Sequence, residues 1–486
     1  MTMLKDTPLI FTKGSKSFKS SYIRPLDVEM PDLAAYYGEN YRAELPNIPN
    51  VDEITAIRHY TNMSNKNFSV EVGTYPLGSC TMKYNPKVNE DMASLPGFAN
   101  LHPYQACETV QGSLELLYEL ELQLNDLTGM DAYTFQPAAG AHGELAGILL
   151  IKAYHEDRGD SKRDTIIVPD AAHGTNPATA AMAGYKVREV KSNEHGLVDL
   201  DALAAVLGDD VAGLMLTNPN TLGLFDCNID QITQMVHDCG GLCYYDGANL
   251  NPIMMQARPG DMGFDCVHLN VHKSLSTPHG GGGPGAGPVG CKDFLKKYLP
   301  RPVVVKEDDG YTLDYDMPGS MGMLRSFIGS FGVLVRTYAY MLRNGVDGLK
   351  EVSEGAVANA RYIMERVKEY YELPYDEPCM HEFVITSAWQ KEKYGIDTND
   401  IAKRLIDYGF HPPTVYFPLI VHEAMMIEPT ETETWRDVDA LAQALIDIAK
   451  ECETEPELVK GAPHSTPIAR PDETRAAKDQ ILTCLD

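Results

Sequence analysis

The chain has 486 residues, enough for two or three domains, and 44% of them are hydrophobic. Its 41 lysines and arginines against 69 acidic residues leave a formal charge of −28. A surface this acidic repels nucleic acid and anionic membranes, so neither is an expected partner. The sequence MTMLKDTPLI lacks a signal-peptide pattern, and no apolar run approaches the roughly 18 residues of a membrane span. We therefore expect a cytoplasmic protein.

The ten cysteines are scattered, without a CxxC pair or the paired spacing of a zinc site. Cys239 and Cys243 are four apart, but a strand is predicted to begin between them, so they do not share a face. The cysteines are expected to be reduced, mostly buried thiols, and no metal is expected.

Residues 1–60 are predicted to form an N-terminal arm. Between Thr7 and Leu26 there is no acidic residue, and the basic residues there are Lys13, Lys16, Lys19 and Arg24. Two interpretations remain open: a frayed, solvated terminus, or an arm that docks on an acidic partner subunit.

Residues 71–86, EVGTYPLGSCTMKYNP, contain too many turn formers for a regular element and predict an ordered loop. A helix follows, indicated by leucines three and four residues apart and ending near Gly129. These leucines, which we expect in the core, are Leu114, Leu117, Leu120, Leu124 and Leu127.

From residue 131 the pattern alternates between strand and helix. Strands are predicted at 131–135, 165–169, 185–190, 211–217, 241–246, 266–271 and 286–291. Helices are predicted at 143–157, 175–184 and 229–238. This alternation indicates an α/β fold with a mostly parallel sheet covered on both faces.

The C-terminal part predicts a smaller α+β domain. Helices are expected within 328–370 and at 398–408 and 433–450, with a strand at 381–387. We therefore expect three parts: the arm at 1–60, a large α/β domain at 61–345 and a small domain at 346–486.

Two stretches contain residues suited to catalysis. In 264–291, a short strand leads to Lys273, and residues 280–290 then include seven glycines and two prolines. A partly desolvated lysine there favours its neutral amine, a nucleophile towards carbonyls. In 241–250, a buried strand ends at Asp246, where α/β proteins bind ligands. Pyridoxal-phosphate enzymes use this pair: an acid at the pyridine nitrogen and a lysine that holds the aldehyde as an imine.

Several long motifs run along the chain: YPLGSCTMKYNP, FQPAAGAHGE, PDAAHGTNPATAAMAGYKV, LTNPNTLGLF, YDGANLN, HLNVHK, PHGGGGPG and APHSTPIARPDETRAA. These motifs resemble the P-protein family of the glycine cleavage system, the pyridoxal-phosphate glycine dehydrogenases (decarboxylating). The resemblance runs from about residue 60 to the end, and the chain looks like the lysine-carrying second subunit of two-subunit members.

The resemblance implies a fold-type I large domain, like that of aspartate aminotransferase, and pyridoxal 5'-phosphate as cofactor. His173 would stack on one face of the pyridine ring and Ala248 would pack on the other. Asn218 or Thr217 would reach the phenolic oxygen, and His272 would donate to the phosphate.

The strand-to-helix turn at AAGAHGE is the predicted phosphate site. Backbone N–H groups at a helix N-terminus bind anions, and here they would come from Ala139, Gly140 and Ala141. His142 and the loop 75–84 are candidates for contacting the substrate or the lipoyl arm.

The implied reaction is loss of CO2 from glycine and transfer of the aminomethyl group to the lipoyl arm of the H-protein. Lys273 would act as general base, and Asp246 would keep the ring nitrogen protonated. The implied partner is P-protein subunit 1, in an α2β2 assembly. Two alternatives remain open: another fold-type I decarboxylase or aminotransferase acting alone, and a non-catalytic partner of an active subunit.

Overall fold

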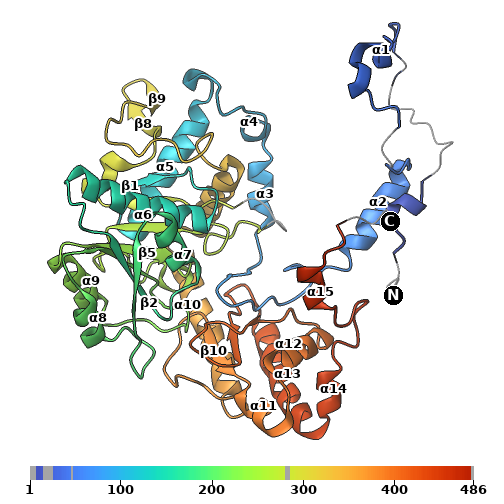
Figure 1. Ribbon diagram of the computed structural model, residues 1–486, viewed down its shortest axis with the longest axis vertical. Helices are drawn as coiled ribbons and strands as arrows, with labels where there is room; N and C mark the ends of the chain where they lie inside the picture. Colours follow the sequence, from blue (N-terminus) through green and yellow to red (C-terminus); the bar gives the residue numbers. More distant parts are fainter. Residues whose placement is uncertain (1–6, 15–23, 25, 45–47, 280–284, 483–486) are drawn as a thin grey trace. The chain divides into compact units, whose positions relative to one another are not determined.

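Figure 1 shows the computed structural model of the chain, which describes residues 7–14, 24, 26–44, 48–279 and 285–482. The chain divides into two compact units. One comprises Met1–Val72 with His464–Asp486, and the other comprises Gly73–Pro463. Lys16 and Lys19 of the predicted basic arm lie outside the described residues, so that prediction stays untested.

The first unit consists of short helices. Its longest, α2, begins after Asp52, whose side chain accepts the Thr55 N–H at 2.8 Å and so satisfies an N–H that lacks an intrahelical partner. The helices are η1 (Ile10–Thr12), α1 (Leu33–Tyr37), η2 (Gly38–Asn40), α2 (Glu53–Ser64) and α15 (Glu473–Lys478).

The second unit is built on a seven-stranded sheet of order β1-β7-β6-β5-β4-β2-β3, green in Figure 1. Strands β2 to β6 pair in parallel, whereas β7 is antiparallel to β1 and β6. The strands are β1 (Ala132–Thr134), β2 (Thr165–Pro169), β3 (Lys186–Val190), β4 (Val211–Leu216), β5 (Leu242–Gly247), β6 (Cys266–Leu269) and β7 (Val289–Cys291). All seven predicted strands, and the mostly parallel sheet, are confirmed.

Helices cover both faces of this sheet, which explains its continuously buried strands. Side chains alternate between faces, so Tyr244 packs with α6 and α7 while Tyr245 packs with α5, α9 and α10. These helices are α5 (Gln111–Thr128), α6 (Gly140–Asp157), α7 (Thr175–Met182), α9 (Ile229–Asp238) and α10 (Phe331–Val367). The predicted leucine helix is α5, and the five leucines predicted to lie in the core are all buried.

The C-terminal part of this unit has a second hydrophobic core, formed by residues between 360 and 459. Its sheet has the order β10-β12-β11, with β10 (Phe383–Thr386), β11 (Thr414–Val415) and β12 (Ala424–Ile427), all antiparallel. Its helices are α11 (Ala388–Tyr394), α12 (Thr398–Asp407), α13 (Trp435–Thr454) and α14 (Pro456–Lys460).

Helix α10 contributes to a hydrophobic core beside the large sheet and to the core of the C-terminal part. Gly345 interrupts it with φ 60°, a left-handed conformation that glycine adopts readily. The expected boundary between large and small domains falls at this residue, and the division at 60 and 345 stays a prediction.

Several short elements were not predicted, because two turns of helix or a short hairpin leave little periodicity to detect. They are α3 (Lys87–Ala93), α4 (Pro96–Ala99), η3 (Cys107–Thr109), α8 (Leu200–Val206), η4 (Asn251–Ile253), η5 (Asp293–Tyr298) and the hairpin β8 (Val303–Glu307) with β9 (Gly310–Asp314).

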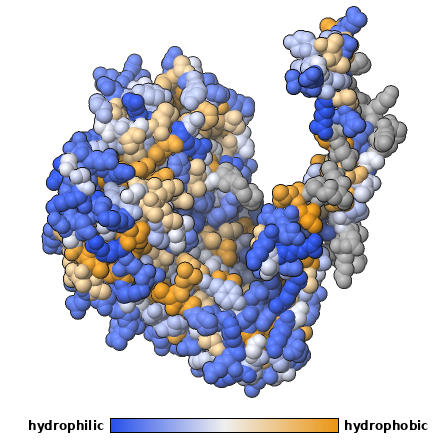
Figure 2. All heavy atoms as spheres, viewed as in Figure 1, coloured by the Kyte–Doolittle hydropathy of each residue, from blue (hydrophilic) through white to orange (hydrophobic). Residues whose placement is uncertain are grey.

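The face of the second unit in Figure 2 is mostly hydrophilic with scattered apolar patches. Among the helices of the described residues, none is both long and apolar enough to cross a membrane.

Candidate active site

The parallel strands of the large sheet end at a cavity of about 180 Å³. Because parallel strands share one carboxyl edge, residues far apart in sequence meet there. The lining residues are Ser79, Gly140, Ala141, Glu144, His173, Thr175, Thr217, Thr221, Asp246, Ala248, Asn249, His268, Asn270, His272 and Lys273. The two residues predicted to carry the chemistry, Lys273 and Asp246, therefore line one cavity.

Asp246 lies at the end of β5 and is only 2% exposed. Its Oδ2 accepts an N–H of Asn176 at 2.9 Å, and its Oδ1 accepts the Ala248 N–H at 3.0 Å. Burial raises the pKa of this carboxyl, but nearby His268, these hydrogen bonds and Lys273 together outweigh burial and lower it. Asp246 is thus held ionised, as an acceptor facing the cavity.

Lys273 follows β6 in a turn, where its N–H bonds to Asn270 O at 2.9 Å. Its Nζ donates to the backbone carbonyl of Ser79 at 2.7 Å. Ser79 belongs to the predicted loop 75–84, which pairs with β12 through a bridge between Leu77 and Ile427. The loop therefore connects the three-stranded sheet β10-β12-β11, the small sheet, to Lys273.

The turn before α6 faces the same cavity. Helix α6 begins at Gly140 after Ala139, and its first N–H groups have no partner within the helix. A Cβ at Gly140 would lie 2.6 Å from Asn270 Oδ1, so only glycine fits. A Cβ at Gly287 would lie 2.3 Å from Ala139 O, so the described part of the glycine loop packs directly on this turn.

This set of groups fits pyridoxal phosphate. A carboxylate, a lysine amine and a helix N-terminus are the partners of its ring nitrogen, aldehyde and phosphate. Within the described residues, Thr217 Oγ1 and Asn270 Oδ1 are buried on the cavity wall without a hydrogen-bond partner. Buried polar atoms are normally paired, so these two indicate a site that binds a polar ligand.

Some of the remaining predicted residues line the cavity and others do not. His173, Ala248 and His272 line it, and His173 is exposed, with its Nδ1 2.9 Å from Thr175 Oγ1. Burial, then His279 and Lys273, lower the pKa of His272 to about 4, so this side chain is neutral. His142 does not line the cavity, and its Nδ1 accepts the Ala138 N–H at 3.2 Å.

Of the pair predicted to reach the phenolic oxygen, only Thr217 lines the cavity. Asn218 is fully buried behind it, and its side chain exchanges hydrogen bonds with the backbone of Asp226 at 2.8 and 3.3 Å. Its amide therefore holds the turn after β4. Ala139, the residue before α6, is likewise outside the cavity lining.

The sequence reasoning missed a network behind Asp246. The two N–H groups of the Asn176 side chain donate to Asp246 Oδ2 and, at 3.0 Å, to Glu144 Oε2. His268 Nε2 lies 3.5 Å from Asp246 Oδ1, and its Nδ1 shares a hydrogen bond with the Tyr244 hydroxyl. The only sequence signal was that Asn176 and His268 lie inside motifs already singled out.

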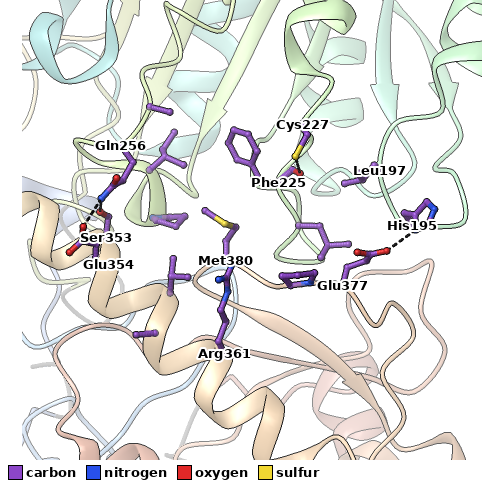
Figure 3. Close-up of a pocket in the computed structure, with 17 residues that line it drawn as sticks. His195, Leu197, Phe225, Cys227, Gln256, Ser353, Glu354, Arg361, Glu377 and Met380 are labelled. Atoms are coloured by element: carbon purple, nitrogen blue, oxygen red, sulfur yellow. Dashed lines mark hydrogen bonds and ion pairs between the residues drawn. The ribbon is translucent and has the colours of Figure 1, made fainter.

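A larger hollow of about 1020 Å³ lies elsewhere in the second unit, between α10 and the loops after β4 and β5 (Figure 3). Phe225 and Met380 project into it, and Glu354 and Arg361 come from α10. Its lining contains no lysine, so it lacks the group needed to bind an aldehyde cofactor. The smaller cavity, not the larger, carries the candidate chemistry.

Comparison with protein families identifies two matching models. The model of the glycine cleavage system P-protein matches residues 36–316. The model of the glycine dehydrogenase C-terminal domain matches residues 352–464. Together these matches span the large sheet and the small domain.

Two relatives are described as probable glycine dehydrogenase (decarboxylating) subunit 2. The protein from Caldanaerobacter subterraneus subsp. tengcongensis is 59% identical over 99% of both chains. That from Alkaliphilus oremlandii is 56% identical over 98% of this chain and 97% of its own.

Solved structures show the fold. A glycine decarboxylase (P-protein) of the glycine cleavage system, in inhibitor-bound form, matches with TM-score 0.73 and 19% identity, covering 86% of this chain and 95% of its own. A Burkholderia pseudomallei sphingosine-1-phosphate lyase matches with TM-score 0.63 and 14% identity, covering 88% and 97%. The predicted fold-type I class is confirmed.

Proposed function

Because the chain belongs to the glycine cleavage system P-protein family, we propose that it decarboxylates glycine with pyridoxal phosphate bound at Lys273. The observation that supports this most directly is the shared cavity of Lys273 and Asp246, opposite the N-terminus of α6. A chain that only steadied another subunit would have no use for this arrangement. The open alternative of a non-catalytic partner is therefore not favoured.

The cofactor, when bound, supplies an aldehyde for amines and a ring that withdraws electrons from the reacting carbon. Asp246, ionised and fixed by two N–H donors, would hold a proton at the ring nitrogen. The N–H groups of Gly140 and Ala141 would bind the phosphate, whose negative charge the helix dipole favours. Thr217 Oγ1 would bind the phenolic oxygen.

Lys273 Nζ would hold the cofactor through its aldehyde, and as a free amine it would accept and hold a proton. Ser79 O keeps this amine within the cavity. His173 and Ala248 line the cavity and would cover the two faces of the cofactor ring. The neutral His272 donates to the phosphate without adding positive charge.

The proposed partners follow from the family. The lipoyl arm of the H-protein accepts the aminomethyl group as CO2 leaves, and P-protein subunit 1 completes an α2β2 assembly. The proposed location is the cytoplasm.

The test is glycine-dependent exchange of labelled bicarbonate with lipoylated H-protein, measured on the chain alone and after mixing with subunit 1. Exchange that requires both partners is expected. Lys273→Ala should abolish exchange together with the visible absorption of bound cofactor. Lys292→Ala is the matched control, since Lys292 also donates to a backbone carbonyl, Gly129 O at 2.6 Å, and does not line the cavity. Unchanged cofactor absorption in Lys273→Ala would contradict the assignment.

A further inference from the structure

Two buried glutamates from the small sheet lie side by side near the candidate active site. Glu382 immediately precedes β10 and Glu428 immediately follows β12. Phe383 of β10 pairs with Ile427 of β12 in antiparallel register. Glu382 and Glu428 are the next residues beyond this pair, so the two carboxylates lie opposite each other. Both residues are 0% exposed. Like charges directly opposite each other in a sheet are destabilising, so this arrangement needs compensation.

Both carboxylates hold the loop that reaches the active-site lysine. Glu382 Oε2 accepts the Ser79 N–H at 2.7 Å, and Glu428 Oε2 accepts the Thr81 N–H at 2.9 Å. Ser79 and Thr81 have φ of 64° and 45°, which non-glycine residues rarely adopt. The side chains of this pair therefore fix a strained loop segment.

Ser79 joins the pair to Lys273. Its N–H binds Glu382 while its carbonyl accepts the Lys273 Nζ. Lys273 is thus the cation on the other side of the loop, and its positive charge lowers the pKa of both carboxyls. When the Lys273 nitrogen loses its positive charge on binding the aldehyde, the two carboxylates lose this compensation.

The other ionisable groups nearby do not replace it. The charge of Lys83 also lowers the pKa of Glu428, but Lys83 is paired with Glu431 at 2.8 Å and keeps this charge whether or not Lys273 loses its own. Burial raises the pKa of Cys80, so its thiol is neutral. His381, whose Nε2 is 3.9 Å from both Glu382 and Glu428, has its pKa lowered to about 3 by burial and by Lys273.

Burial raises the pKa of both carboxyls, and the charge of Glu428 raises that of Glu382 further. The loop hydrogen bonds and the positive charge of Lys273 lower both pKa values. Loss of the Lys273 charge therefore makes this closely spaced pair better suited to holding one proton between its two members.

We propose that Glu382 and Glu428 form a proton-accepting pair that positions Lys273 through the Ser79–Thr81 loop and gains a proton when Lys273 loses one. This inference rests on the proposed function, in which Lys273 binds the cofactor. The two glutamates are positioning residues, since neither lines the cavity.

The charge balance closes within these three side chains. When the Lys273 ammonium binds the aldehyde, its nitrogen forms a C=N bond and gives up three protons. Two of them leave with the aldehyde oxygen as water, and the third forms an O–H bond on a carboxylate. The starting set, an ammonium and two carboxylates, has net charge −1, and so does the product set of neutral imine nitrogen, carboxylic acid and carboxylate. No change of net charge is then needed inside the buried site.

Hydrogen bonding and electrostatics favour different members of the pair. The oxygens of Glu382 accept N–H groups only, from Ser79 and from the Asn249 side chain at 3.1 Å. Glu428 Oε1 instead faces the Thr81 hydroxyl at 2.5 Å, which can either donate or accept and so suits a protonated Glu428. The charge of Glu428, however, raises the pKa of Glu382, so we assign the proton to the pair rather than to one member.

The experiment counts protons released when pyridoxal phosphate binds, by calorimetry in buffers of different ionisation enthalpy. It uses the full-length protein in the assembly in which it purifies. Glu428→Gln and Glu382→Gln should each release one more proton than the wild type, because a lone carboxylate stays ionised. Because binding releases one more proton in these variants, their cofactor affinity should rise tenfold more per pH unit than that of the wild type.

The matched control is Glu423→Gln. Glu423 is a buried glutamate that precedes β12 as Glu428 follows it, but it is paired with Lys391 and Thr398. This variant should release as many protons as the wild type. Infrared difference spectra of the wild type should also gain a carboxylic-acid C=O band on cofactor binding, a measurement that needs no variant.

Equal proton counts in all four proteins, or no new carboxylic-acid band, would overturn the inference and leave the proposed function standing. A wild-type protein that binds no pyridoxal phosphate would overturn both.

Discussion

Replacing Asn176 by leucine, a side chain of similar size without donors, should damage both stability and cofactor binding. Asn176 is fully buried, and its two side-chain N–H groups donate to Glu144 at 3.0 Å and Asp246 at 2.9 Å. A hydrogen bond to a charged group contributes about 1.5–3 kcal/mol. Losing the two hydrogen bonds to the buried carboxylates of Glu144 and Asp246 should lower the unfolding free energy by about 3–5 kcal/mol.

The assay is urea unfolding of the cofactor-free protein, together with a titration of pyridoxal phosphate followed by visible absorbance. Since Asp246 would lose one of the two donors that fix it, cofactor affinity should fall about tenfold or more, equivalent to about 1.4 kcal/mol. Thr179→Val is the control, because Thr179 Oγ1 donates only to Glu144, at 3.2 Å. The reasoning is refuted if Asn176→Leu binds the cofactor as tightly as Thr179→Val.

Three further outcomes are expected. Asp246→Asn should keep the fold, measured by circular dichroism, but slow glycine-dependent bicarbonate exchange by orders of magnitude, since each ~1.4 kcal/mol of lost stabilisation is tenfold in rate. Gly147→Ala should lower the melting temperature, because its Cβ would lie 2.3 Å from the Tyr244 ring in a fully buried layer. His237→Ala should destabilise more at about pH 5 than at about pH 9, measured by urea unfolding. The hydrogen bond to Asp265 raises the pKa of His237 above its unfolded value, so its stabilisation is lost as the pH rises through the folded pKa. An equal effect of His237→Ala at both pH values would contradict this.

The sequence by itself determined the large sheet. Buried strands and amphipathic helices have different periods, so the alternation from residue 131 predicted all seven strands within a few residues of their ends. The leucine spacing that predicted α5 worked for the same reason. Lys273 and Asp246 could be singled out as candidates because Asp246 ends a strand and Lys273 lies between a strand and a glycine-rich loop, positions at the ligand-binding edge of such a sheet.

Tertiary structure alone decided which side chains surround those two residues. Asn218 lies next to Thr217 in the sequence, yet one binds the backbone of Asp226 and the other faces the cavity. Adjacent residues can point in opposite directions, so motif membership could not separate them. Asn176 gave no signal of its own, because its role depends on reaching two carboxylates on other elements.

The glutamate pair is the clearest case of this limit. Glu382 and Glu428 are 46 positions apart and belong to no motif that the sequence reasoning singled out. The antiparallel register of β10 and β12 brings them together, and the loop at Ser79 connects them to a lysine more than a hundred residues earlier. Local patterns arise from neighbours along the chain, whereas charge compensation depends on neighbours in space.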